Sequence, residues 1–277
     1  MKKHIKTICF LIVTVACLQP GLQAQDCSVI GQNNFVKLVL DSYYLWYREM
    51  PDANPALFDS PEAYLEAVRY RPLDKSFSYI SGRAATDAFY SNSEFIGIGF
   101  TQRQLSSEQL RVAQVFPDSP ASDGGLRRGD YLLEINGRSI KELIESGELR
   151  FELGPSTIGT RVDLAWKSLQ GVSRSETFIK RIVTIPTVSQ SNVFELNGNL
   201  IGYLHFRNFV EPSIQALNSA FTEFRKQGIN ELILDLRYNG GGLVHVARHL
   251  ASLIGGTRTN QKVFVESIHN DKQTNRN

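Results

Sequence analysis

The apolar residues of the first part of the chain recur at the spacing of α-helices. Asn33 or Asn34 is placed to cap a first helix. The inward face of that helix is expected to carry Phe35, Leu38, Val39, Ser42 and Trp46. Ser60-Pro61 predicts the start of a second helix, and residues 84–90 predict a third. Three short helices indicate a small helical domain over residues 28–92.

Beyond Glu94 the pattern becomes that of short strands separated by turns. Alternating apolar residues predict strands at 95–100, 110–116, 131–135, 162–166 and 176–182. Asn136-Gly137 is typical of a tight hairpin turn. Ser119-Pro120 predicts a helical turn, and residues 140–151 predict a second, longer helix. These elements predict one barrel-like β domain with two helices, over residues 93–184.

The remaining residues, 185–277, alternate between strand and helix. The predicted elements are strands at 193–196 and 200–206, a helix at 212–227, a strand at 231–237 and a helix at 243–253. A βαβ order of this kind predicts parallel pairing of the strands on either side of the helix. Residues 262–267 are predicted as a further strand. The last region is therefore the start of an α/β core, and the chain is a multidomain α+β protein.

Three glycines, Gly240–Gly242, follow the strand at 231–237 directly. Such a turn allows backbone N–H groups to point at a ligand and opens a helix N-terminus. Asp235 and Arg237 precede it, and we expect an internal ion pair or hydrogen bonds that fix the loop. An acid–base pair is not expected, because an arginine that is always protonated cannot shuttle protons at neutral pH. His245 and His249 have the spacing of a metal pair, but no third ligand accompanies them. We predict no metal site and no cofactor.

The N-terminus has the pattern of an export signal over residues 1–24. Basic residues at its start precede an apolar run, Thr7–Leu18, which is shorter than the roughly 20 residues that a membrane span needs. Cleavage is expected before Gln25, which predicts a periplasmic or cell-envelope protein. The alternative is lipoprotein processing at Cys17, which would give the protein its one membrane contact.

Charge and cysteine content add little to this interpretation. Removing the three lysines of the signal from the 30 basic residues leaves 27 against 28 acidic residues, a net charge of −1. This balance gives no reason to expect nucleic acid as a partner. After ordinary cleavage Cys27 is the one remaining cysteine, so no internal disulfide is expected.

The middle region resembles a bacterial PDZ domain. The matching residues occur in the expected order: Ser119-Pro-Ala121, Gly125-Leu126, Gly129-Asp130 and Leu133–Gly137. PDZ domains bind an extended peptide as an added strand and hold its terminal carboxylate in a loop of backbone N–H groups. Gly97, Ile98, Gly99 and Phe100 resemble that loop. The alternative for this loop is a bulged strand, and the resemblance implies C-termini of peptides or unfolded proteins as partners.

The order of the three regions resembles the C-terminal processing peptidases, which are tail-specific serine proteases. Residues 234–242 resemble the Asp-Leu-Arg-x-Asn-x-Gly-Gly motif of that family, and Asp74–Ile80 resembles the segment before its PDZ domain. The resemblance implies a serine nucleophile activated by a lysine. It also implies that the glycine turn supplies part of an oxyanion hole, for which Gly240 and Gly241 are the candidates.

The serine and lysine of that family are expected some tens of residues beyond the glycine turn. We found no Gly-x-Ser-x-Gly or Ser-x-x-Lys pattern in the sequence up to Asn277. The first hypothesis is an exported endopeptidase of which this chain lacks the nucleophile. The alternatives are a non-catalytic PDZ protein that binds peptides, as a truncated or inactive protease, and a scaffold whose incomplete core pairs with a partner chain.

Overall fold

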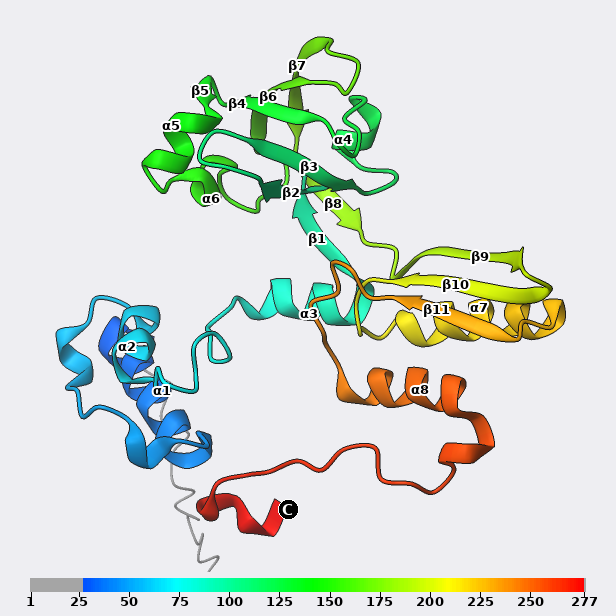
Figure 1. The fold of residues 1–277 in the computed structure, drawn as a ribbon. Coiled ribbons are helices and arrows are strands. Elements are labelled where there is room, and N and C mark those ends of the chain that lie inside the picture. The colour runs from blue at the N-terminus through cyan, green and yellow to red at the C-terminus, as the bar shows by residue number, and fades with distance from the viewer. Residues whose placement is uncertain (1–26, 277) are drawn as a thin grey trace, which may run out of the picture. The chain divides into compact units, whose positions relative to one another are not determined.

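The computed structural model describes residues 27–276, which divide into two compact units. One unit extends to Ile80 and also contains the segment that begins at Glu266, and the other comprises Ser81–Val265 (Figure 1). The predicted export signal, residues 1–24, and the alternative processing site at Cys17 lie outside the described residues.

The first unit is helical. Its elements are α1 (Val29–Tyr43), the 3₁₀ turns η1 (Tyr47–Glu49) and η2 (Pro55–Leu57), α2 (Pro61–Val68) and η4 (Asp271–Arg276). The Oγ of Ser60 accepts a hydrogen bond from the N–H of Ala63 at 3.1 Å, and Pro61 occupies the first helical position. The predicted start of the second helix is therefore confirmed, because capping depends on neighbouring residues alone.

The predicted cap of the first helix is wrong. Ser28 caps α1 by accepting the N–H of Gly31 on its Oγ at 3.1 Å. Asn33 is fully buried within the helix, where its Nδ2 donates to the carbonyl oxygens of Pro55 and Phe58 at 2.9 and 2.8 Å. A residue with a typical capping side chain is used instead to hold the loop before α2.

The inward face of α1 also differs from the predicted face. Phe35 and Leu38 are more than half exposed, whereas Leu40 is buried and Val36 packs against the core. Asn33, Val36 and Leu40 recur at the spacing of one helix face. Burial of Asn33 therefore turns this face toward the core and leaves Phe35 and Leu38 outside, whereas Trp46 packs against the core as predicted.

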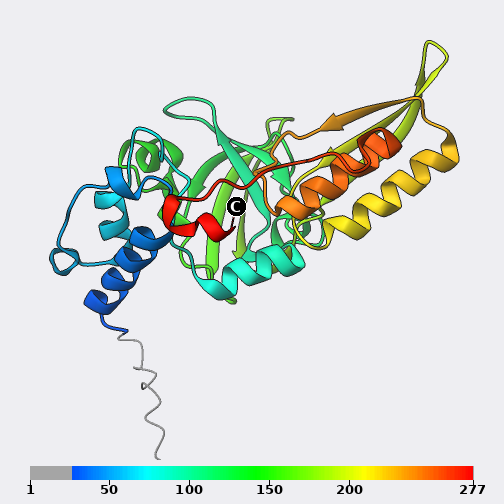
Figure 2. The same cartoon turned by 90° about the horizontal axis from the view of Figure 1, so that it is seen from below.

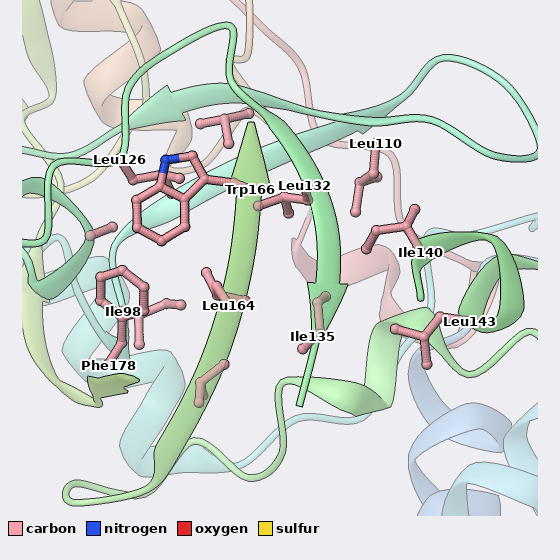
Figure 3. Close-up of a cluster of buried hydrophobic side chains, with 13 residues drawn as sticks. Ile98, Leu110, Leu126, Leu132, Ile135, Ile140, Leu143, Leu164, Trp166 and Phe178 are labelled. Carbon is pink, nitrogen blue, oxygen red and sulfur yellow. The ribbon is translucent and has the colours of Figure 1, made fainter. Parts of the chain in front are cut away.

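The second unit begins with α3 (Arg83–Asn92) and continues into a β-rich region. Its strands are β1 (Glu94–Gly97), β2 (Phe100–Gln104), β3 (Leu110–Val115), β4 (Tyr131–Ile135), β5 (Arg138–Ser139), β6 (Arg161–Lys167), β7 (Ser173–Ile179) and β8 (Arg181–Thr184). One sheet has the order β2-β3-β4-β6-β7 with β5 beside β4, and β1 pairs with β8. Buried side chains that include Ile98, Leu132 and Trp166 form one core inside this region (Figure 3).

Residues 140–151, predicted as one helix, form two short helices. The first is α5 (Ile140–Glu145) and the second is α6 (Leu149–Glu152). Gly147 lies between them with φ at +72°, a left-handed conformation that a continuous helix cannot contain. The predicted helical turn at Ser119 is observed as α4 (Pro120–Asp123).

The last region of the second unit is a mixed three-stranded sheet covered by two helices. Its elements are β9 (Val188–Leu196), β10 (Asn199–Phe206), α7 (Ser213–Gln227), β11 (Glu231–Asp235) and α8 (Val244–Gly255). The order is β11-β10-β9, and β10 and β11 pair in parallel as predicted. The two helices lie side by side (Figure 2) and share a core with the sheet.

The prediction of a strand at 262–267 is wrong. These residues follow the 3₁₀ turn η3 (Gly256–Thr259) as irregular backbone, and Val263 and Val265 are more than half exposed. Alternating apolar residues form a strand only where a neighbouring strand supplies hydrogen bonds. The predicted α+β class of the chain is nevertheless confirmed by the order of its elements.

Candidate functional site

A loop bounded by glycines joins β1 to β2. It contains Gly97, Ile98, Gly99 and Phe100, the residues predicted to bind a peptide terminus. The N–H groups of Ile98 and Gly99 meet no acceptor within residues 27–276. Two adjacent N–H groups without partners offer a place where the oxygens of a carboxylate can accept hydrogen bonds.

The carbonyl groups of this loop are held from inside the domain. The carbonyl oxygen of Ile98 accepts the N–H of Ala121 at 2.7 Å, and that of Gly99 accepts the N–H of Phe116 at 2.8 Å. The side chain of Ile98 belongs to the buried core (Figure 3). These contacts fix the backbone of the loop while the two N–H groups stay free.

Both glycines are required by the space around the loop. Gly99 has φ at +93°, and a Cβ at this position would lie 2.1 Å from the Cβ of Ser119. A Cβ at Gly97 would lie 2.5 Å from the ring of Phe95. Ser119 itself is buried and caps α4. The Ser-Pro-Ala sequence therefore packs directly against the candidate loop.

Strand β2 continues from the loop along the edge of its sheet. Within the described part of the chain it pairs on one side alone, with β3. Thr101 Oγ1 and Gln102 Oε1 are buried on this strand without a hydrogen-bond partner in the same part of the chain. Buried polar atoms are normally paired. A free strand edge next to a loop of free N–H groups is the arrangement that adds a peptide as a further strand.

The glycine turn between β11 and α8 is held by the side chain of Asn239. Its Oδ1 accepts the N–H of Gly241 at 2.7 Å, and its Nδ2 donates to the carbonyl oxygen of Phe206 at 3.1 Å. The carbonyl oxygen of Gly241 accepts the N–H of Phe209 at 3.0 Å. The N–H of Gly240 meets no acceptor among residues 27–276. Of the two predicted oxyanion donors, Gly240 has the free N–H group.

Asp235 and Arg237 form the expected ion pair at the start of this turn. Asp235 Oδ1 accepts the backbone N–H of Arg237 at 2.9 Å and its Nε at 3.0 Å. The hydroxyl of Tyr203 donates to Asp235 Oδ2 at 2.6 Å. Hydrogen bonds from Arg237, and then from Tyr203, hold the pKa of the Asp235 carboxyl well below its usual range. Asp235 is therefore an ionised anchor for the turn and a poor proton acceptor.

The two histidines of α8 have separate partners. His245 Nε2 lies 3.2 Å from Glu211 Oε1, and His249 Nε2 lies 2.8 Å from Asn218 Oδ1. No group of three or more His, Cys, Asp or Glu side chains suited to a metal ion occurs in the described part of the chain. The contacts of both histidines are explained by pairing within the protein.

One serine–histidine contact was missed by the sequence analysis. Ser189 Oγ and His205 Nδ1 lie 2.6 Å apart, and His205 Nε2 lies 2.9 Å from the carbonyl oxygen of Arg237. A carbonyl only accepts hydrogen bonds, so Nε2 carries a proton, and in a neutral imidazole Nδ1 is then the acceptor for the Ser189 hydroxyl. The strands β9 and β10 bring these residues together where their pairing register shifts. No short sequence motif predicts such a contact.

Three family models match the chain in sequence. The Peptidase S41 N-terminal domain matches residues 31–79, the PDZ domain matches residues 111–150, and Peptidase family S41 matches residues 200–277. The matched ranges follow the order that the sequence predicts: a helical domain, a PDZ domain and a region that contains the glycine turn. The candidate loop lies shortly before the matched part of the PDZ domain.

Relatives of known sequence agree with these models. The "Probable CtpA-like serine protease" of Staphylococcus epidermidis is 32% identical over 163 residues, which are 58% of this chain and 31% of that protein. The "Carboxy-terminal processing protease CtpA" of Bacillus subtilis is 31% identical over 162 residues, which are 58% of this chain and 33% of that protein. The alignments thus span about a third of these curated relatives.

A solved structure is also similar. The crystal structure of a Bacteroides fragilis protein assigned to the S41 proteases has a TM-score of 0.50 and 27% sequence identity, covering 77% of this chain and 57% of that one. The predicted family is therefore confirmed by matches in all three regions. The chain belongs to peptidase family S41, the C-terminal processing proteases that carry a PDZ domain.

Proposed function

We propose that this chain belongs to an exported serine-type endopeptidase that captures protein C-termini through its PDZ domain and cleaves peptide bonds. The observation that carries the proposal is the pair of free N–H groups, of Ile98 and Gly99, at the start of the edge strand β2. The names of the two relatives, a serine protease and a carboxy-terminal processing protease, support the same reaction class.

Binding begins with the terminal carboxylate of the substrate. Its oxygens accept the N–H groups of Ile98 and Gly99, and hydrogen bonds to a charged group contribute about 1.5–3 kcal/mol each. The residues before the terminus then add to β2 as an antiparallel strand, and main-chain hydrogen bonds extend the contact. The free carboxylate is the feature that separates a chain terminus from an internal segment, so it determines specificity.

Cleavage requires an oxyanion donor near the reacting carbonyl. Gly240 and Gly241 are the candidates, and removing one such donor typically costs about 3–4 kcal/mol of barrier. Gly240 can act in the observed conformation, whereas Gly241 would first have to release Asn239 Oδ1. The family implies a serine nucleophile with a lysine base, and the proposal assigns neither role within residues 27–276.

Export rests on the basic and apolar pattern of residues 1–24. Among the helices of residues 27–276, none is long and apolar enough to span a bilayer. N-terminal sequencing of the mature protein tests the proposal. A start at Gln25 supports ordinary export, a lipid-modified Cys17 supports the lipoprotein form, and a mature chain that begins at Met1 contradicts both.

Peptide capture is tested by fluorescence anisotropy with labelled peptides that end in a free carboxylate or in an amide. We expect the carboxylate peptide to bind at least about tenfold more tightly, and Gly99→Val to remove the difference. Gly137→Ala is the matched control, because Gly137 also has a positive φ but has open space around it. Equal binding of the two peptides would refute terminal recognition.

A serine-reactive probe then separates the two hypotheses about chemistry. Labelling together with cleavage of an unfolded protein supports the endopeptidase. Carboxylate-dependent binding without labelling supports the alternative, a non-catalytic protein that binds peptides. Any labelled residue is identified by peptide mapping, and Ser189→Ala shows whether the Ser189–His205 pair is responsible.

A further inference from the structure

Three arginines line a hollow of about 270 Å³ beside β2 and β3, which we call the arginine hollow. They are Arg103, Arg111 and Arg128, and Tyr238 forms part of the same wall. No aspartate or glutamate lines the hollow, and none of the three arginines pairs with a carboxylate within residues 27–276. Surface arginines usually lie among charges of both signs, so a hollow of one sign indicates an anionic ligand.

The strand register places two of these charges directly opposite each other. Arg103 on β2 is the cross-strand partner of Arg111 on β3. Like charges at such positions destabilise a sheet. Arg111 is also held in place, because its Nε donates to the carbonyl oxygen of Gly129 at 3.0 Å and its guanidinium lies 4.7 Å from the ring centre of Tyr131. A carboxylate in the hollow would relieve this repulsion.

A further arginine without an anionic partner lies next to the hollow. Arg207 is 6% exposed, and its Nη1 donates to Gln114 Oε1 while its Nε has no partner in the described residues. Its guanidinium carbon lies 5.8 Å from the ring centre of Tyr238, and that of Arg128 lies 5.7 Å from the same ring. Burial lowers the pKa of Arg207, which shows that its charge is poorly compensated.

Tyr238 connects these charges to the glycine turn. It lies between Arg237 and Asn239 and has φ at +67°, a strained conformation for a residue with a bulky side chain. The ring that Arg128 and Arg207 approach thus belongs to the turn that also presents the free N–H of Gly240. An anion in the arginine hollow would lie beside the proposed site of cleavage.

We propose that the arginine hollow is a specificity subsite for the side-chain carboxylate of an acidic residue in the bound peptide. This inference rests on the proposed function, because the peptide reaches the hollow by adding to β2. Arg103 belongs both to that strand and to the lining of the hollow. Strands rise by about 3.3 Å per residue. If the terminus of the peptide lies at Gly99, the residue opposite Arg103 is therefore about the third or fourth from the end.

The test is a set of labelled peptides that differ at one position by Glu or Gln. Their affinity for the full chain is measured by fluorescence anisotropy. We expect Glu at about the third or fourth position from the end to bind about tenfold more tightly than Gln, as a charge-assisted hydrogen bond allows. Arg128→Gln and Arg103→Gln should each reduce this preference to less than about threefold. The preference should also weaken as salt is raised from about 0.05 to 0.5 M.

The control is Arg150→Gln. Arg150 also stacks on an aromatic ring, that of Phe151 at 4.4 Å, but it lies outside the hollow, so the preference should remain. A second discriminating variant is Arg207→Met, which replaces a poorly compensated buried cation. It should lower the Glu preference without lowering the melting temperature, whereas a merely structural arginine would lower the melting temperature and leave the preference unchanged.

The outcomes separate this inference from the proposed function. Carboxylate-terminated peptides that bind without any Glu preference overturn the subsite and leave terminal recognition standing. A Glu preference in amide-terminated peptides supports the subsite and contradicts recognition by the loop at Gly99. No binding of any peptide overturns both. A Glu preference that survives Arg103→Gln and Arg128→Gln also overturns the assignment to this hollow.

Discussion

Replacing Gly99 with alanine tests whether the loop before β2 depends on the space left by a missing side chain. The alanine would have to keep the backbone φ of +93°, which costs about 1–2 kcal/mol for a residue other than glycine. Its Cβ would also lie 2.1 Å from Ser119 Cβ. Ser119 is buried and donates from its Oγ to the carbonyl oxygen of Phe116 at 2.7 Å, so it cannot move away freely. Overpacking of this kind adds about 1–3 kcal/mol.

The expected loss is therefore about 2–5 kcal/mol in the free energy of unfolding of the PDZ domain. Urea denaturation followed by the fluorescence of Trp166 measures it, because this tryptophan is 1% exposed in the core of that domain. The only other tryptophan, Trp46, lies in the helical unit. Trp46→Phe in the background removes its signal and keeps the transition specific to one domain.

Gly137→Ala separates the two contributions. Gly137 lies in the same domain with φ at +78°, and a Cβ there meets nothing within 4 Å. Its substitution should cost the strain alone, about 1–2 kcal/mol. Equal losses for the two variants would refute the claim that Ser119 fixes the loop by close contact. A loss at Gly99 below that at Gly137 would refute the conformational argument as well.

Three further changes test other parts of the molecule. The lowered pKa of the Asp235 carboxyl contributes stability that is present above about pH 4 and is lost as the pH falls below it. Asp235→Asn should therefore flatten the pH dependence of the urea-denaturation midpoint between about pH 6 and 3, and an unchanged pH dependence would contradict this role. Asp74→Ala should cost the helical unit about 2–4 kcal/mol by Trp46 fluorescence, because it leaves the O–H donor of Tyr44 and two backbone N–H groups without an acceptor; a loss below about 0.5 kcal/mol would contradict this. Asn270→Ala should accelerate amide exchange at the end of α1, where Asn270 donates to carbonyl oxygens, and unchanged exchange would show that this contact is dispensable.

Features that depend on a few neighbouring residues were predicted correctly. Asn136 and Gly137 have φ at +50° and +78°. These are the conformations of the tight hairpin turn that Asn-Gly favours. Ser60 and Pro61 likewise start α2, as their sequence predicts. Such conformational preferences depend on two or three residues, so they can be predicted without knowledge of the fold.

Features that depend on distant partners were not predictable. The face of α1 is determined by Asn33, whose partners Pro55 and Phe58 lie more than 20 residues away. The end of the same helix contacts Asn270, whose Nδ2 donates to the carbonyl oxygen of Ser42 at a separation of 228 residues. A helical pattern shows which residues are apolar, but more than one face of α1 is apolar enough to pack against the core.

The candidate binding residues show the same division. The spacing of Gly97 and Gly99 indicated a loop of exposed backbone, but the sequence could not show that the N–H groups of Ile98 and Gly99 lack partners. It also gave no sign of Arg207, because a single arginine after a strand is typical of an exposed position, whereas this one is 6% exposed. Both properties arise from packing between segments far apart in the chain.

The hydrogen bonds of the glycine turn restrict how an oxyanion could be bound there. An oxyanion hole commonly combines two N–H donors, one of them from the residue beside the nucleophile. Gly241 already donates to Asn239 Oδ1, and Asn239 is itself tied to Phe206 on β10. Using the Gly241 N–H for an oxyanion would therefore cost the turn one of the hydrogen bonds that position it. Of the two predicted donors, Gly240 is therefore the one that can act without rearrangement of the turn.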